Sequence, residues 1–305
     1  MDKQIVGIIY LFITALIWGA AFVSQLLGGA ELGEYSFLAY RGLFGCITIF
    51  IMIVILNLQR HKKLTFFIEG EDKKKTILNS FWCGIVLFLA MITQQIGVQR
   101  TDVAKSGIIA SLEVVCVPIL LMLFYGRKIK KFTWLFIFLA MFGIMMLNFG
   151  SISGLNVGDL WVFISTILYS ITIIQVPKYI KDIDPLKFSF FRFVIVGIFA
   201  FILALIFKNK FMTAENLSAT LPSVLFSGVM SSGIAYTFQI LGQRYCEPVV
   251  ATLIMGLEGV FAAIFGWLLL GQSLNFIQIC GILLTFISTC IVQISDMHSN
   301  IGANN

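Results

Sequence analysis

Ten long apolar runs decide what this 305-residue chain can fold into. A helix of about twenty residues, at 1.5 Å per residue, crosses the roughly 30 Å hydrocarbon core of a bilayer. The runs are continuous rather than alternating in polarity, which excludes a membrane β-barrel. We predict an all-α membrane protein with ten transmembrane helices over residues 4–27, 35–58, 77–98, 103–125, 132–150, 157–177, 187–207, 221–243, 247–270 and 274–294.

The composition agrees with a lipid environment. Hydrophobic residues make up 59% of the chain and charged residues 12%, whereas soluble domains carry about 25% charged residues. The net charge of +6 lies mostly in short clusters between the apolar runs. Such clusters orient helices in a bilayer, so we expect the lipid bilayer as a partner and no nucleic acid.

The cysteines and histidines give no sign of a metal site. The six cysteines are scattered without a CxxC pair, and both histidines fall in polar segments. A zinc site needs clustered thiolates or imidazoles. We therefore predict no metal, cofactor or catalytic residue, and expect the cysteines to be reduced and packed.

Basic residues are distributed unequally between the two sides of the predicted bundle. With the N-terminus in the cytoplasm, fifteen Lys and Arg fall on the cytoplasmic side and four on the other. Basic loops stay cytoplasmic, so both termini are predicted to lie there. The loops are too short for a soluble catalytic module. The sequence predicts a multi-pass protein of the cell membrane, either an inner or a plasma membrane.

The chain matches itself at two closely related offsets. At an offset of 145, residues 94–126 align with 239–271, with nine of 33 positions identical. These matches include Gln94/Gln239, Gly97/Gly242, Glu113/Glu258 and Gly126/Gly271. At an offset of 151, the corresponding pairs are Gly7/Gly158, Trp18/Tyr169, Phe37/Phe188 and Arg41/Arg192. We predict a first repeat over residues 1–150, a second over 151–296, and a polar tail over 297–305.

Each predicted repeat holds five helices. Because five is odd, the second copy enters the membrane from the opposite side. Inverted repeats allow many secondary transporters to adopt two related states that open to opposite faces. The alternative is a duplicated scaffold without a transport role.

Several motifs in the second half resemble a known family. They are SGIAYT at 232–237, GQRY at 242–245, LEGVFAA at 257–263 and GWLLLG at 266–271. In the first half, VPIL at 117–120 and YGR at 125–127 occupy the equivalent helix. The chain closely resembles the EamA-type transporters of the drug/metabolite transporter superfamily over nearly its whole length. The resemblance implies ten helices, cytoplasmic termini and transport of small metabolites, often outward. Relatives commonly carry an acidic residue where this chain has Arg127 and Gln272.

Charged residues within the apolar runs are the first candidates for a site. Glu113 and Glu258 lie near the midplane of their predicted helices. Arg41 and Arg192 lie about 9 Å inside opposite membrane faces. Buried charges are costly and usually face a cavity or a partner. The four groups either line a substrate and proton pathway, or they form structural Arg–Glu bridges, or the arginines reach to the interface.

Uncharged polar and aromatic residues complete the predicted site. Gln94, Gln95 and Gln239 offer donors and acceptors. Trp18, Tyr169 and Tyr236 offer aromatic walls, although packing is the alternative role for each. Pro118 lies inside its predicted helix and is a candidate hinge, because proline opens backbone hydrogen bonds.

These features predict a secondary active transporter of a small organic metabolite, amino acid-like or of another kind, that acts as an exporter. A proton is the candidate coupling ion. The chain has no GxxxxGK[ST] loop, which argues against ATP-driven transport. A passive channel and an intramembrane enzyme are the alternatives. No HExxH or GxSxG motif defines enzyme chemistry, so we expect no enzyme.

Overall fold

The computed structural model describes residues 3–59, 73–101, 103–147, 156–180, 183–270 and 275–303, and every regular element in these ranges is a helix. Seven helices there are long and apolar enough to cross a membrane. Shorter apolar helices cover Ile109–Tyr125, Lys131–Met146 and Phe276–Val292. The prediction of an all-helical, multi-pass membrane protein is confirmed.

Seven of the helices run without a break. They are α1 (Lys3–Leu32), α2 (Glu34–Gln59), α3 (Lys73–Val98), α6 (Lys131–Leu147), α7 (Val157–Tyr179), α8 (Pro185–Ile206) and α13 (Phe276–Ala303). Helix α1 extends past the predicted end at residue 27, and α13 continues into the predicted polar tail. The predicted boundary between the repeats, at residues 150–151, lies outside the described residues.

Three of the predicted segments, over 103–125, 221–243 and 247–270, are helical but contain an interruption that was not predicted. The first divides into α4 (Val103–Ser111) and α5 (Glu113–Tyr125), and the third into α11 (Pro248–Met255) and α12 (Glu258–Leu270). At these breaks, Leu112 N–H donates to Ile109 O and Leu257 N–H to Ile254 O, a tighter turn than in an α-helix. The second divides into α9 (Leu217–Leu225), the π-helix η1 (Phe226–Ala235) and α10 (Tyr236–Gln243).

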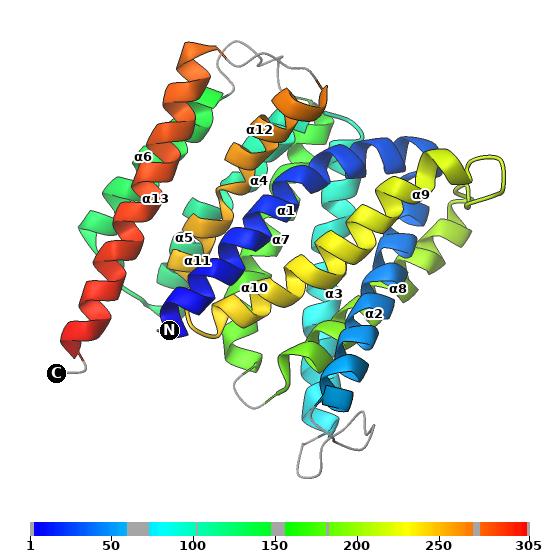
Figure 1. Ribbon diagram of the computed structural model, residues 1–305, viewed down its shortest axis with the longest axis horizontal. Coiled ribbons are helices and arrows are strands. Elements are labelled where there is room, and N and C mark those ends of the chain that lie inside the picture. The colour runs from blue at the N-terminus through cyan, green and yellow to red at the C-terminus, as the bar shows by residue number, and fades with distance from the viewer. Residues whose placement is uncertain are drawn as a thin grey trace.

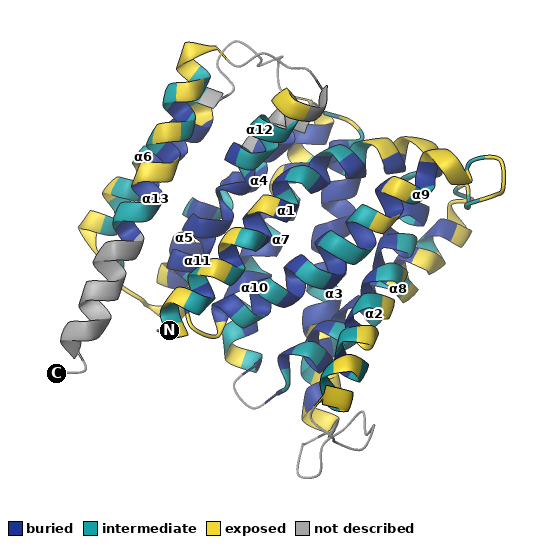
Figure 2. Ribbon diagram, in the orientation of Figure 1, coloured by how far each residue is buried: buried dark blue, intermediate teal, exposed yellow. Residues whose placement is uncertain are grey.

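The helices form one bundle with a broken-helix centre (Figure 1). Helices α6 and α13 pack together at one edge, and α2 and α8 pack together toward the other. Helix α1 runs between them along η1, α10 and α12. Large apolar side chains such as Phe124, Phe138 and Phe276 are exposed on the outside, while buried residues gather on the central helices (Figure 2). An exposed apolar surface of this extent indicates contact with lipid.

Two close helix crossings depend on glycine. At one, α1 meets α10, where a Cβ on Gly242 would lie 2.9 Å from the Gly7 carbonyl oxygen. At the other, α3 meets α7, where a Cβ on Gly97 would lie 2.9 Å from the Gly158 carbonyl oxygen. Small residues allow such backbone contact in membrane helices. Any side chain at these positions would force the helices apart.

Candidate functional site

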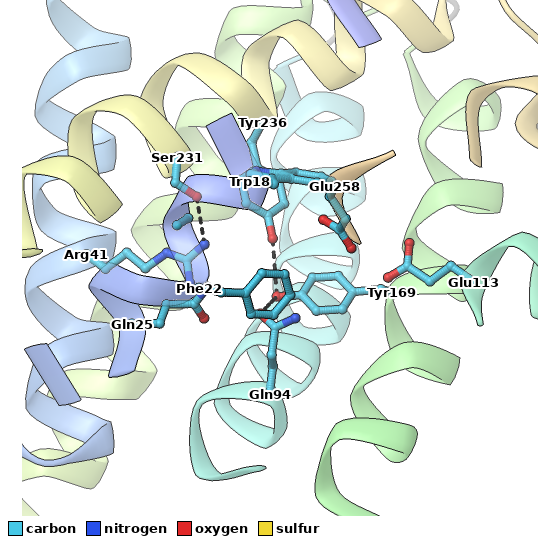
Figure 3. A pocket seen from close by; sticks show the side chains of 11 residues that line it. Trp18, Phe22, Gln25, Arg41, Gln94, Glu113, Tyr169, Ser231, Tyr236 and Glu258 are labelled. Atoms are coloured by element: carbon cyan, nitrogen blue, oxygen red, sulfur yellow. Dashed lines mark hydrogen bonds between the residues drawn. The ribbon is translucent and has the colours of Figure 1, made fainter. Parts of the chain in front are cut away.

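A small polar cavity lies at the centre of the bundle (Figure 3). Its volume is about 20 Å³, which is room for about one water molecule. The lining residues come from α1, α2, α3, α5, α7, η1, α10 and α12. They are Trp18, Ala21, Phe22, Gln25, Arg41, Gln94, Glu113, Tyr169, Ser231, Tyr236 and Glu258. The cavity thus brings together seven of the ten predicted pathway residues.

The two glutamates occupy matching positions at helix breaks. Glu113 is the first residue of α5, directly after Leu112, and Glu258 is the first residue of α12, directly after Leu257. After the breaks, the Cys116 N–H donates to the Leu112 oxygen and the Phe261 N–H to the Leu257 oxygen. Glu258 is buried and Glu113 half-buried. Among the described residues neither carboxylate has a hydrogen-bonding or ion-pair partner, and both line the cavity (Figure 3).

Arg41 approaches the cavity from the opposite side (Figure 3). Its Nε donates to Ser232 Oγ at 3.0 Å and its Nη2 to Ser231 Oγ at 3.0 Å. Its Nη1 is buried and has no partner among the described residues. The side chain is only 2% exposed, so it does not reach to the interface, and it forms no ion pair with either glutamate. In this structure Arg41 therefore neither bridges to a glutamate nor reaches the interface, and its role in a pathway stays a prediction.

An aromatic and amide chain crosses the cavity. Tyr236 donates its hydroxyl hydrogen to the Tyr169 hydroxyl at 3.2 Å, and Tyr169 donates to Gln94 Oε1 at 3.2 Å. The Trp18 ring lies 4.8 Å from the Tyr236 ring, and its buried Nε1 has no described partner. These contacts hold the aromatic groups in fixed orientations around the space between the arginine and the glutamates.

The other predicted residues lie outside the cavity lining. Gln95 Nε2 donates to the Gln25 backbone oxygen at 3.0 Å, which ties α3 to α1. Gln239 is buried with its Oε1 unpartnered among the described residues. Arg192 is also buried and lies apart from the cavity. Pro118 lies inside α5, and the break occurs earlier, at Leu112, so a hinge at Pro118 stays a prediction.

Sequence reasoning missed Gln25 and the serines that bind Arg41. Small side chains such as Ser231 and Ser232 usually serve close helix packing, so their type alone does not assign them to a site. A buried arginine needs hydrogen-bond acceptors, and a search for such acceptors near Arg41 could have identified the two serines. No group of three or more potential metal ligands occurs in the described part of the chain.

Comparisons with known proteins agree with this architecture. An uncharacterized transporter from Archaeoglobus fulgidus is 25% identical over 96% of this chain and 87% of its own length. The uncharacterized transporter YoaV from Bacillus subtilis is 24% identical over 93% of this chain and 94% of its own. The uncharacterized inner membrane transporter YedA from Escherichia coli strain K12 is 24% identical over 88% and 84%.

A solved structure has the same fold. It superposes with a TM-score of 0.74 at 12% sequence identity, covering 95% of this chain and 96% of that one. The model of the EamA-like transporter family matches the chain twice, over residues 5–149 and 156–294. The chain therefore belongs to the EamA-like transporter family.

Proposed function

We propose that this membrane transporter is a secondary active carrier of a zwitterionic, amino acid-like metabolite, with the central cavity as its binding site. The observation that carries the proposal is the separation of charge around the cavity, with Arg41 on one side and Glu113 and Glu258 on the other (Figure 3). Such a site is complementary to a molecule that bears a carboxylate and an ammonium group a few bonds apart.

The unsatisfied groups around the cavity support this substrate class. Arg41 Nη1 and Trp18 Nε1 are buried donors without described partners, and they suit a substrate carboxylate. Gln25 Oε1 is a buried acceptor that also has no described partner. Together with the two carboxylates, it suits a substrate ammonium group. Trp18, Tyr169 and Tyr236 would surround the remainder of the molecule. Unmet donors and acceptors are costly when buried, so a ligand that pairs with them is favoured.

We also propose that the chain forms ten transmembrane helices in two inverted five-helix repeats, over residues 1–150 and 151–296. The two separate matches to the family model support this division. So do the two helix breaks, since Leu112 and Leu257 differ by the offset of 145 that relates the two glutamates. The two glycine crossings support it as well, because the repeat relates Gly7 to Gly158 and Gly242 to Gly97, so that the crossing of Gly7 with Gly242 corresponds to the crossing of Gly158 with Gly97.

The small volume of the cavity supports alternating access rather than a permanent pore. Outside its lining, Gln95 and Gln99 donate to the Gln25 backbone oxygen, each at 3.0 Å, and join the end of α3 to α1. Gln243 Nε2 donates to the Ile173 oxygen at 3.3 Å and joins α10 to α7. A space for one water cannot hold an amino acid, so these contacts must open for transport. We assign export as the direction, following the resemblance, and a proton exchanged at the midplane carboxylates as the coupling ion.

Flux through purified protein in proteoliposomes tests this function. Substrates are first sought by comparing the metabolites released by cells with and without the gene. The proposal predicts saturable counterflow of an amino acid-like compound and none of its amide, which lacks the carboxylate. Non-saturating flux would instead indicate a channel, and formation of a new product would indicate an enzyme.

The proposed orientation makes a separate prediction. Reporter fusions truncated after Lys75 and after Lys131 are expected to report the cytoplasm, and a fusion near Glu31 the outside. The physical reason is the fifteen-to-four excess of basic residues on one side. The structure supports an even number of membrane crossings, because α1 begins and α13 ends on the same side of the bundle (Figure 1). A consistent reversal of the three reporters would invert the assignment of faces.

A further inference from the structure

Arg192 is a buried guanidinium without hydrogen bonds to the described part of the chain. It lies on α8, is 1% exposed, and its Nε, Nη1 and Nη2 all lack a hydrogen-bond partner among the described residues. Its guanidinium carbon lies 5.3 Å from the centroid of the Phe188 ring. Removing a charge from water without hydrogen bonds is strongly unfavourable. A buried guanidinium in this environment is therefore stabilised by an anion that accepts its hydrogen bonds.

Its counterpart in the other half of the chain has two of its three nitrogens hydrogen-bonded. Arg41 corresponds to Arg192 at the offset of 151 and binds Ser231 and Ser232. Both arginines are buried, and Tyr169 and Tyr236 are near neighbours of both. The tyrosine pair therefore lies next to two guanidinium groups, one that faces the cavity and one beyond its lining.

Among the described residues no carboxylate forms a hydrogen bond with Arg192. Another near neighbour is Cys83, whose thiol donates to Gln175 Oε1 at 3.5 Å. The hydrophobic residues packed together with Phe188 include Val176, Ile180 and Ile240. In this structure Arg192 therefore forms no bridge with Glu113 or Glu258, and its burial keeps it from the interface.

We infer that Arg192 is a second carboxylate-binding subsite, on the cytoplasmic side of the tyrosine pair. A carboxylate is planar and accepts two parallel hydrogen bonds, which matches the three free nitrogens of a guanidinium. The subsite rests on the proposed function, because it would hold the substrate carboxylate before Arg41 does. Two arginines at mirrored depths would give an anionic group a favourable position on each side of the midplane.

The first test compares the stability of matched variants of the purified full-length protein in detergent. Arg192→Met removes a charge that has no partner and keeps most of the side-chain volume, so the melting temperature is expected to rise by about 2 °C or more. Arg41→Met breaks two hydrogen bonds to serine and is expected to lower it. A fall for Arg192→Met as large as that for Arg41→Met would show a structural role and overturn the inference.

The second test measures anion binding directly, with acetate as the probe. Protein carrying ¹⁵N-arginine is titrated with sodium acetate at constant ionic strength, and the Arg192 Nε signal is identified by its loss in Arg192→Lys. We expect a saturable shift of that signal. The Arg244 side chain is exposed, so its signal provides the control and should not saturate. An Arg192 signal that does not move while the protein stays folded would overturn the subsite.

These measurements need no transported substrate, so the two proposals can fail separately. An acetate response without any flux would count against transport and support the anion site. Saturable flux without an acetate response at Arg192 would support transport and overturn the subsite.

Discussion

Replacing Arg41 by glutamine is expected to raise the KM for the transported metabolite at least about 30-fold. The free Nη1 of Arg41 is the main donor that faces the cavity, and the other two nitrogens are fixed by Ser231 and Ser232. Loss of one partner from a buried, hydrogen-bonded charge pair costs about 2–5 kcal/mol. Each 1.4 kcal/mol corresponds to a tenfold change in affinity.

Arg41→Lys tests the geometry of the hydrogen-bond donors separately from the charge. Lysine keeps the charge but presents one compact ammonium group, which cannot bind both serines and still present a planar pair of donors to a carboxylate. Its KM is expected to lie between those of the wild type and Arg41→Gln. Arg244→Gln removes an exposed charge and serves as the control. An unchanged KM in both Arg41 variants would remove this residue from the binding site.

Glu258→Gln is expected to abolish accumulation driven by a pH gradient while exchange of substrate continues. A glutamine cannot bind and release a proton, but its amide oxygen still accepts a hydrogen bond from an ammonium group. The loss of charge in that bond is worth about 1–1.5 kcal/mol, so exchange should slow by no more than about tenfold. The accumulation ratio is expected to fall to one.

Glu113→Gln provides the matched comparison, because Glu113 has the same position at the start of its helix. We expect the stronger effect at Glu258. It is the more buried of the two, and the segment around it, from 256 to 266, includes the small residues Gly259, Ala262 and Ala263. The assay is uptake into proteoliposomes with an imposed pH gradient. Normal gradient-driven uptake by both glutamine variants would end the proposal of proton coupling through these carboxylates.

The helical content and the location of most helices could be predicted from the sequence. In lipid the backbone must satisfy its own hydrogen bonds, and an apolar run of twenty residues has few alternatives to a helix. The breaks at Leu112 and Leu257 could not be predicted in this way. Each break directly precedes a glutamate within a largely apolar run, and residue type alone does not reveal a tighter turn there. The π-helix over Phe226–Ala235 was unforeseen because its residues form part of one long apolar run that predicted a single helix.

The residues of the candidate site that could be predicted best were the charged residues within the apolar runs. Glu113, Glu258 and Arg41 line one cavity because charges inside a membrane protein need a polar environment. The same reasoning could not show that Arg41 lines the cavity and Arg192 does not, because this difference depends on which helices pack against each arginine. The apolar context also concealed Gln25, Ser231 and Phe22, since polar or aromatic type alone does not reveal which face of a helix a residue occupies.

The most direct test of a central, alternately exposed substrate site is thiol labelling at Ala21, in a variant that lacks the six native cysteines. Ala21 is buried and lines the cavity, and Ala21→Cys changes it little. A small, membrane-impermeant thiol reagent is applied to proteoliposomes from either side. Ala200→Cys on α8 is the control, because Ala200 is buried outside the cavity lining. We predict that Cys at position 21 reacts from both sides, that the transported metabolite slows the reaction, and that the control stays inert. Labelling of neither side, in protein that still transports, would contradict a substrate path through this cavity.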